Sequence, residues 1–492
     1  MQRRHFLLPL AALRAQNAAV HDVGARKQLF LDTKFIESSA GVALTVNPPA
    51  RTGEKLVTAD APWEKQMHLG SYSSVLQENG KIRLWYDIRD DAKRPGQNPD
   101  VMCVAYAEST DGLHFTKPAL GHVAHRGSRQ NNFVMPSDPA ALALGGCSVM
   151  LDENPACPPV ERYKSWQKIY PKPGSGITGP HRVFVSPDGL RWNLSEKLVT
   201  GLRAADTQPT WFWDRRLRRY VGYSREWIIF AGEQNIRMVS YNESADGFAW
   251  RNPELVLAPD EADFTASTRP RVDFSTMTLR GERLVEHPDA ASARRPTPGK
   301  WDTNSTADQV PDPGAPLDIY GPGITPYEDA YVALYSQFHH WGAAHEGPDT
   351  GDVGLALSRD GRHFHRPGSR QPFLRLGPAG AFDSAWTWAL PRPIRMGSEL
   401  WIYYLGSNAR HGGAAPARLE TAISRAVLRL DGFVSADFAY TGGTLLTPLL
   451  RFQGKRLELN LDTSGGGVCR VAILDEEGAP VPGFSMREAD PM

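Results

Sequence analysis

The chain has 492 residues, which is long enough for one large β-rich domain and a smaller appendage. Its 55 Lys and Arg residues balance its 55 Asp and Glu residues, so the formal net charge is zero and no electrostatic field favours nucleic acid or an anionic membrane. After the N-terminus, no stretch has the roughly 20 consecutive apolar residues that span a bilayer.

The first residues resemble an export signal. Arg3 and Arg4 precede a short apolar run that ends at Leu13. Paired arginines before such a run are typical of twin-arginine signals. We therefore expect residues 1–20 to direct export, which would place the mature protein in the periplasm or outside the cell.

One seven-residue pattern, Ser-x-Asp-Gly-x-x-aromatic, recurs along the chain. Asp-Gly favours a tight turn, because glycine accepts positive φ and the Asp side chain binds nearby amides. Each copy follows a strand-like run, and its aromatic residue opens a return strand. The pattern therefore predicts one recurring β-hairpin. The copies begin at Ser109, Ser186, Ser244 and Ser358, with a degenerate fifth copy at Asp431-Gly432.

The strand-like runs around these turns group into five blades of a β-propeller. A blade takes roughly 40–50 residues, and insertions such as the Pro- and Ala-rich residues 286–316 account for the uneven intervals. Residues 27–31 and 42–46 are candidates for a strand that closes the ring onto the last blade. The predicted blade strands are 73–76, 81–87 and 103–108; 147–151, 162–170 and 182–185; 210–213, 219–223 and 237–243; 323–326, 330–337 and 353–357; 388–394, 400–405 and 421–430.

The sequence changes character at Thr444. Residues 456–461 and 468–474 alternate apolar and polar side chains, as strands with one buried face do. We expect an all-β protein with a five-bladed propeller over residues 21–443 and a C-terminal β-sandwich portion over 444–492. That portion either packs on the propeller or is an incomplete domain.

The mouth of a propeller channel is where residues before each first strand meet residues after each second strand. In this chain an acid precedes every first strand, and charged and aromatic residues follow the second strands. This mixture suits sugar chemistry, since one carboxyl protonates the leaving oxygen, another attacks or activates water, and aromatic rings stack on the sugar. The candidate catalytic residues are Asp206, Asp318, Glu64 and Asp87, and the candidate substrate-binding residues are Arg89, Arg225, Glu226, Trp227, His339, Asp383 and Trp386.

Asp206 is the first candidate among the acids, because Asp206-Thr207-Gln208 sets three polar groups ahead of an apolar Trp-Phe-Trp run. A neighbour such as Arg225 would keep Asp206 ionised as nucleophile or base, and Asp318 would then donate the proton. For every acid the competing interpretation is a turn cap. The Asp of each repeated motif is expected to be structural.

No metal or cofactor is expected from the sequence. His339-His340 has no further ligands at metal-binding spacing, so a polar or core role is favoured. Phosphate-binding loops, dinucleotide-binding glycine patterns and serine nucleophile elbows are absent from the sequence. Cys147 and Cys157 either form a disulfide or remain two free thiols.

The repeated hairpins, Asp206-Thr207-Gln208 with Trp213-Asp214, and the segments 431–434 and 482–484 resemble bacterial proteins grouped with glycoside hydrolase families 32 and 43. The resemblance covers about residues 25–492. It implies a five-bladed propeller with a C-terminal β-sandwich that acts on glycosidic bonds. Family 32 carries Asn-Asp-Pro-Asn in blade one, Arg-Asp-Pro in blade two and Glu-Cys in blade three. This chain lacks all three, so the resemblance implies the fold rather than the catalytic residues.

The leading hypothesis is an exported glycoside hydrolase with a carbohydrate substrate. The alternative is a non-catalytic carbohydrate-binding propeller, and a third hypothesis is a structural interaction module without converging acids. A screen against diverse glycosides separates the first two, because a binding protein would give no turnover.

Overall fold

The structure is a computed structural model. In the described residues the chain is all-β, with three single-turn 3₁₀ helices, Thr33–Phe35, Pro62–Glu64 and Pro159–Glu161. It divides into two compact units, Val46–Phe433 and the described part of Met1–Thr45 with Val434–Met492. The structure describes residues 20–90, 101–135, 143–170, 181–202, 207–230, 233–260, 263, 278–280, 283–285, 317–339, 349–368, 370–411 and 416–492.

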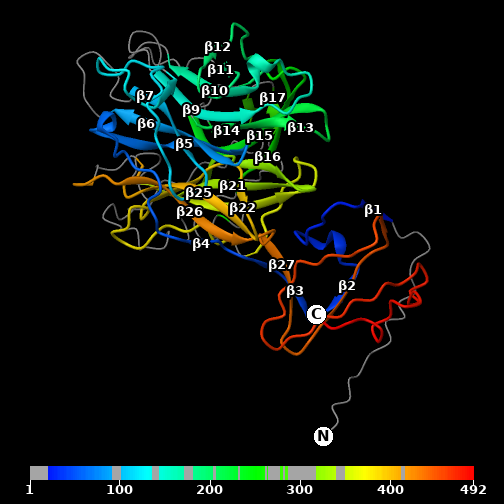
Figure 1. The fold of residues 1–492 in the computed structure, drawn as a ribbon. Coiled ribbons are helices and arrows are strands. Elements are labelled where there is room, and N and C mark those ends of the chain that lie inside the picture. Colours follow the sequence, from blue (N-terminus) through cyan, green and yellow to red (C-terminus); the bar gives the residue numbers. More distant parts are fainter. Residues whose placement is uncertain are drawn as a thin grey trace. The chain divides into compact units, whose positions relative to one another are not determined.

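The larger unit is built from antiparallel groups of strands that follow one another along the chain (Figure 1). Sheet I contains β5 (Met67–Glu78), β6 (Lys81–Asp90), β7 (Val101–Ser109) and β8 (Phe133–Met135). Sheet II contains β9 (Ala143–Leu151), β10 (Tyr163–Tyr170), β11 (His181–Ser186) and β12 (Asn193–Leu194). Sheet III contains β13 (Thr210–Asp214), β14 (Arg219–Phe230), β15 (Glu233–Ser244) and β16 (Trp250–Leu257), extended by β17 (Thr278–Arg280) and β18 (Arg283–Val285).

The remaining strands of this unit form one nine-stranded sheet whose halves are joined by a parallel pair, Gly351 with Trp386. Sheet IV is the first half, with β19 (Leu317–Gly321), β20 (Ile324–Tyr327), β21 (Ala330–His339) and β22 (Thr350–Ser358). Sheet V is the second half, with β23 (Trp386–Ala389), β24 (Ile394–Met396), β25 (Glu399–Ser407), β26 (Thr421–Arg429) and β4 (Ala50–Arg51). The predicted blade strands fall on strands of these five groups.

The four repeated motifs adopt one turn geometry, and they directly follow β7, β11, β15 and β22 of sheets I to IV. In the first copy, the Ser109 hydroxyl accepts the Gly112 amide at 2.9 Å, and Asp111 Oδ1 accepts the two amides that follow the glycine at 2.8 and 2.9 Å. Gly112 has φ of 76°, a value that L side chains rarely adopt. The other three copies repeat these bonds at Ser186, Ser244 and Ser358, so the predicted hairpin and its structural Asp are confirmed. The degenerate copy differs, since Asp431 itself takes φ of 62°.

Neighbouring sheets are tied together through the carbonyl groups of these turn glycines. The Trp85 indole of sheet I donates to Gly189 O at 2.7 Å, and the Tyr223 hydroxyl of sheet III donates to Gly361 O at 2.8 Å. The Tyr403 hydroxyl of sheet V donates to Gly112 O of sheet I at 2.9 Å, so the last sheet packs against the first.

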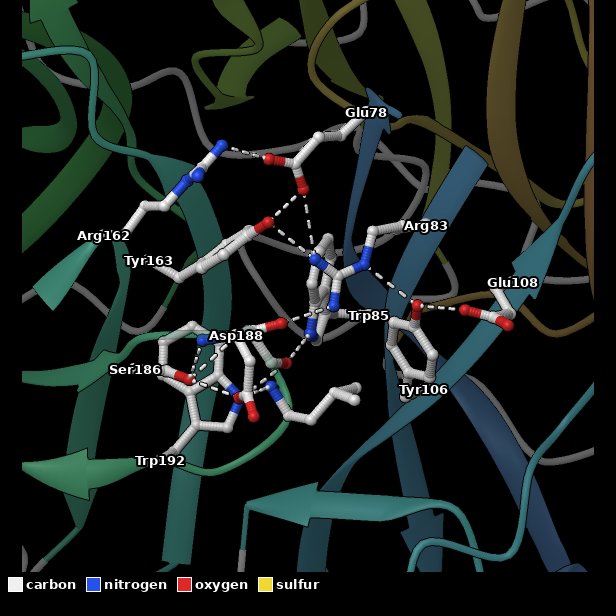
Figure 2. Close-up of polar contacts among 12 residues, drawn as sticks. Glu78, Arg83, Trp85, Tyr106, Glu108, Arg162, Tyr163, Ser186, Asp188 and Trp192 are labelled. Carbon is white, nitrogen blue, oxygen red and sulfur yellow. Dashed lines mark hydrogen bonds and ion pairs between the residues drawn. The ribbon is translucent and has the colours of Figure 1, made fainter. Parts of the chain in front are cut away.

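A polar cluster surrounds the junction between sheets I and II, as Figure 2 shows. Arg83 donates to the hydroxyl groups of Tyr106 and Tyr163 at 2.9 and 2.6 Å. It also donates to the Asp188 carbonyl at 2.6 Å, and its guanidinium lies 4.9 Å from the Trp85 ring. Asp188 therefore belongs to the packing between sheets, as expected for a motif Asp.

The smaller unit pairs the two ends of the chain. The pairs are β1 (His21–Gly24) with β29 (Leu450–Phe452), β2 (Ser38–Ala40) with β28 (Thr444–Leu446), and β3 (Val42–Val46) with β27 (Val434–Phe438). The sequence placed residues 21–45 with the propeller, whereas here they join the C-terminal segment.

Near the ends of the chain the predicted strand at 42–46 is confirmed as β3, but its predicted partner and several other predicted strands are wrong. Residues 27–31 form no strand, and 42–46 pair with β27 rather than with the last blade. The strand that joins sheet V is β4, which pairs with β26. Residues 456–461 and 468–474 also form no strand in the structure, although Cys469 exchanges two backbone hydrogen bonds with Met492 and Leu474 forms an isolated bridge with Pro480.

Candidate functional site

A buried ion pair lies where sheets III and IV meet. Asp318, in the first strand of sheet IV, accepts from the guanidinium of Arg237, in the third strand of sheet III, at 2.7 Å. Arg225, in the second strand of sheet III, is buried beside this pair, since the guanidinium groups of Arg225 and Arg237 lie 5.2 and 5.0 Å from the Tyr320 ring. The sequence placed Asp318 ahead of a first strand at residues 323–326, whereas the structure places it inside β19, and its partner Arg237 lies against the same Tyr320 ring as Arg225.

An aromatic cluster continues this site into sheet V. Tyr320 contacts Phe338, Trp386 and Trp388, with ring centroids 5.1, 6.1 and 5.7 Å apart. His411 stacks on Trp386 at 5.8 Å with an interplanar angle of 27°. We call Tyr320, Phe338, Trp386, Trp388 and His411 the aromatic cluster. Trp386 was a candidate substrate-binding residue, and the structure places it in this cluster.

Asp87 occupies a second buried position, in β6 of sheet I. Burial raises the pKa of this carboxyl, and the charges of Arg89 and His68 oppose the rise only partly. One Arg89 nitrogen lies 3.5 Å from Asp87 Oδ2. A Cβ at Gly70 would stand 2.2 Å from the same oxygen, so only glycine leaves room for the carboxyl there. A buried acid whose pKa is raised is a candidate for proton donation.

Glu226 does not join Arg225, although the two are adjacent in β14. Successive side chains of a strand point to opposite faces of the sheet. Arg225 faces sheet IV, whereas Glu226 is buried with Oε1 3.5 Å from the Ser240 hydroxyl.

Glu64 and Asp383 are buried and bonded to groups with evident structural roles. Glu64 accepts from the Tyr86 hydroxyl at 2.5 Å, from Lys117 at 2.5 Å and from the Ala61 amide at 3.0 Å. Asp383 accepts from Arg51 at 2.8 Å and from the Tyr404 hydroxyl at 2.9 Å. These bonds fit the alternative that both acids hold the chain rather than act on a substrate.

The other candidates are placed less fully. Asp206 lies outside the described residues, as do the predicted excursion at 286–316 and residues 1–19 of the expected signal. The side chain of Trp227 is not described, although its backbone belongs to β14. His339, at the end of β21, has Nε2 3.1 Å from Asp352 Oδ2.

Sequence reasoning missed Arg237, Tyr320, His411 and Asp352. Arg237 could have been predicted, because it is the first residue of the predicted third strand 237–243, and third strands begin at the edge of the sheet where second strands end.

The described residues contain neither a cluster of metal-binding side chains nor a disulfide. They contain no group of three or more His, Cys, Asp and Glu side chains that would hold a metal ion. Cys147 and Cys157 are free thiols, which selects one of the two alternatives left open by the sequence. The part of the chain that the structure describes holds no helix with the length and apolarity of a membrane span.

Comparison with known proteins gives structural similarities only. No family model and no curated protein matches the chain. It is similar to a glycosyl hydrolase from Bacteroides ovatus, with a TM-score of 0.46 and 12% identity over 82% of this chain and 97% of that one. It is also similar to an N-acetylgalactosamine deacetylase from F. plautii, with a TM-score of 0.45 and 13% identity over 79% and 97%. A β-1,2-mannobiose phosphorylase from Listeria innocua gives a TM-score of 0.45 and 12% identity over 79% and 98%.

Proposed function

We propose that this chain is a carbohydrate-active enzyme, a glycoside hydrolase that cleaves glycosidic bonds of a poly- or oligosaccharide. One observation carries the proposal: the buried Asp318–Arg237 pair lies against Arg225 and the aromatic cluster. Aromatic faces stack on the C–H faces of sugar rings, and guanidinium groups donate to sugar hydroxyls. These groups support a role for the Asp318 carboxylate in acting on a bound sugar.

Two acids take the two roles that glycoside hydrolysis requires. Asp318, paired with Arg237, serves as the ionised nucleophile or base, because an adjacent cation favours the charged carboxylate. Asp87, whose pKa burial raises, serves as the proton donor to the leaving oxygen. Asp206 remains a further candidate, with Asp206→Asn expected to lower turnover at least ~100-fold if it acts in the reaction.

The wider architecture is part of the same proposal. Sheets I to V are taken as the five blades of one propeller, supported by the contact of the last sheet with the first. The smaller unit is taken to contain the C-terminal β-sandwich portion. Residues 1–20 are taken as an export signal that delivers the protein to the periplasm or the medium.

The test begins with a panel of aryl glycosides and oligosaccharides to find a substrate. Asp318→Asn and Asp87→Asn should then each lower kcat/KM at least ~100-fold, the scale of a lost acid–base group. Asp87→Asn should in addition remove the alkaline limb of the pH profile, which reports the proton donor.

Asp188→Asn is the matched control, since Asp188 belongs to a rim turn and should leave turnover unchanged. Melting temperatures of all variants separate lost chemistry from lost folding. Near-normal turnover of Asp318→Asn at an unchanged melting temperature would exclude its catalytic role. Binding of a glycan by the parent protein without any turnover would establish the alternative, a non-catalytic carbohydrate-binding propeller.

A further inference from the structure

A small cavity lies among sheets III, IV and V, and Trp388 forms both part of its wall and part of the aromatic cluster. The space accommodates about one water molecule. Two glycines let the strands approach here, since a Cβ at Gly321 would stand 2.4 Å from the Trp388 ring and a Cβ at Gly323 would stand 2.0 Å from Leu334 O. The lining residues are Gln208, Thr210, Gly321, Gly323, Leu334, Ser336, Trp388, Ala389 and Pro391.

Two hydroxyl groups in this lining stand out. Thr210 Oγ1 and Ser336 Oγ are buried, each on a residue 4% exposed, and neither has a hydrogen-bond partner within the described part of the protein. Burying a hydroxyl without a partner costs roughly 1–3 kcal/mol, so proteins seldom leave such groups unbonded. Two such groups facing one cavity from different sheets point to a shared ligand.

The chemistry of the lining selects a neutral ligand. None of the lining side chains is ionisable. Gln208 is already engaged, since Nε2 donates to Ser73 O at 2.9 Å and Oε1 accepts from the Trp388 indole at 3.3 Å. The two hydroxyls can each donate and accept, which matches a molecule that also does both.

We propose that this cavity is a water-binding site, in which one buried water bridges Thr210 of sheet III and Ser336 of sheet IV beneath Trp388. A buried water typically makes about three hydrogen bonds to groups that would otherwise be unsatisfied. This inference goes beyond the proposed function and holds whether or not the chain hydrolyses glycosides. Such a water would link β13 of sheet III to β21 of sheet IV by hydrogen bonds. The side chains of Thr210 and Ser336 make no direct hydrogen bond to each other.

Thr210→Val tests the site, because the substitution keeps the shape and removes the hydroxyl. A bridging water loses one partner, so the melting temperature falls by about 1–3 °C. In a dry cavity the same change removes an unpaired buried hydroxyl and raises the melting temperature. A rise would therefore overturn the proposal.

Thr387→Val is the matched control. Thr387 is fully buried and its hydroxyl also has no partner in the described residues, but it does not line the cavity, so its removal should not lower the melting temperature. Thr210→Val and Ser336→Ala should be non-additive, because both bind the same water. If the melting temperature changes when Na⁺ is exchanged for K⁺ at constant ionic strength, the cavity holds a cation rather than a water, and the proposal is overturned. Density for a water between the two hydroxyls in a crystal structure would confirm it directly.

Discussion

Asp111 and Asp360 show how a single residue organises a turn and sets the charge of its neighbour. In each case Oδ1 accepts two backbone amides, while Oδ2 lies 2.7 or 2.6 Å from Nδ1 of the histidine three residues on, His114 or His363. The hydrogen bond to the carboxylate raises the pKa of both histidines above 6.5. The same bond lowers the pKa of Asp111.

The first prediction concerns this pH dependence. Because the folded-state pKa of His114 is raised, its contribution to stability is fully present below pH ~6.5 and is lost as pH rises through the folded value. NMR titration should therefore show His114 above 6.5 in the parent protein and back near 6.5 in Asp111→Asn. Asp188→Asn, in another motif, should leave His114 unchanged. An unshifted His114 in the parent protein would contradict the prediction.

Residue by residue, the sequence predicted part of the site for clear reasons. Asp318 and Arg225 were selected from strand order, and both are buried in the structure, but the strand that carries Asp318, β19, was not predicted. Glu226 was predicted to lie beside Arg225, but adjacent residues of a strand point to opposite faces of the sheet, so its side chain lies on the other face. His411 reaches the site from outside the predicted strands, through a bridge with Asp349 that is distant in sequence, and no local pattern marks such convergence.

At the scale of elements, three of the four repeated motifs receive a hydrogen bond from the sheet before them. An aromatic residue of one second strand donates to the glycine carbonyl of the next motif, as Trp85, Tyr223 and Tyr403 do. These aromatic residues are buried and also fill the space between sheets, so one side chain supplies both packing and a hydrogen bond. The third motif is contacted differently. Trp166 of sheet II stacks on Trp250, the aromatic residue of that motif, with ring centroids 5.2 Å apart.

The second prediction tests this link. Tyr403→Phe and Tyr223→Phe keep the ring and remove the hydroxyl, which leaves a buried glycine carbonyl with one donor fewer. Each should lower the free energy of unfolding by about 0.5–1.5 kcal/mol in urea titrations. Tyr440→Phe, at a fully exposed tyrosine, should change it by a few tenths at most. Equal effects at all three positions would argue against the hydrogen bonds as the cause.

Elements were predictable where their determinants are local. The Asp-Gly turns carry their geometry in seven residues, and Asn79-Gly80 adopts φ of 52° and 73°, as a tight hairpin turn requires. The alternating runs at 456–461 and 468–474 form no strand, because alternation alone does not fix a regular ladder; 468–474 makes only scattered backbone bonds to the residues that follow it.

For the whole molecule, the decisive pairings join residues that are distant in sequence. Residues 50–57 run beside β26, through β4 and through the Leu56 amide, which donates to Ile423 O at 2.8 Å. In this way an N-terminal segment supplies the outer strand of the last sheet of the larger unit. A short segment of this kind has little sequence signal of its own, which explains why the closing strand was assigned to residues 27–31 and 42–46.

The last prediction concerns the ion pair that accompanies this closure. Arg51 of β4 donates to Asp383 at 2.8 Å, and Asp383 is 2% exposed while Arg51 is 27% exposed. Arg51→Met keeps most of the apolar stem but leaves a buried carboxylate with only the Tyr404 hydroxyl among its bonds described above. Breaking a buried pair from one side costs more than the pair contributes, so we expect a loss of about 1–3 kcal/mol in the free energy of unfolding.

Asp383→Asn in the same background should recover part of that loss, since the uncompensated charge is gone. Lys55→Met is the control, because Lys55 also pairs across this junction, with Glu420 at 2.6 Å, but both side chains are partly exposed, at 42% and 25%. Exposed pairs contribute little, so this change should cost no more than about 0.5–1 kcal/mol. If Arg51→Met costs no more than Lys55→Met, the backbone pairing of β4 closes the sheet without help from the ion pair.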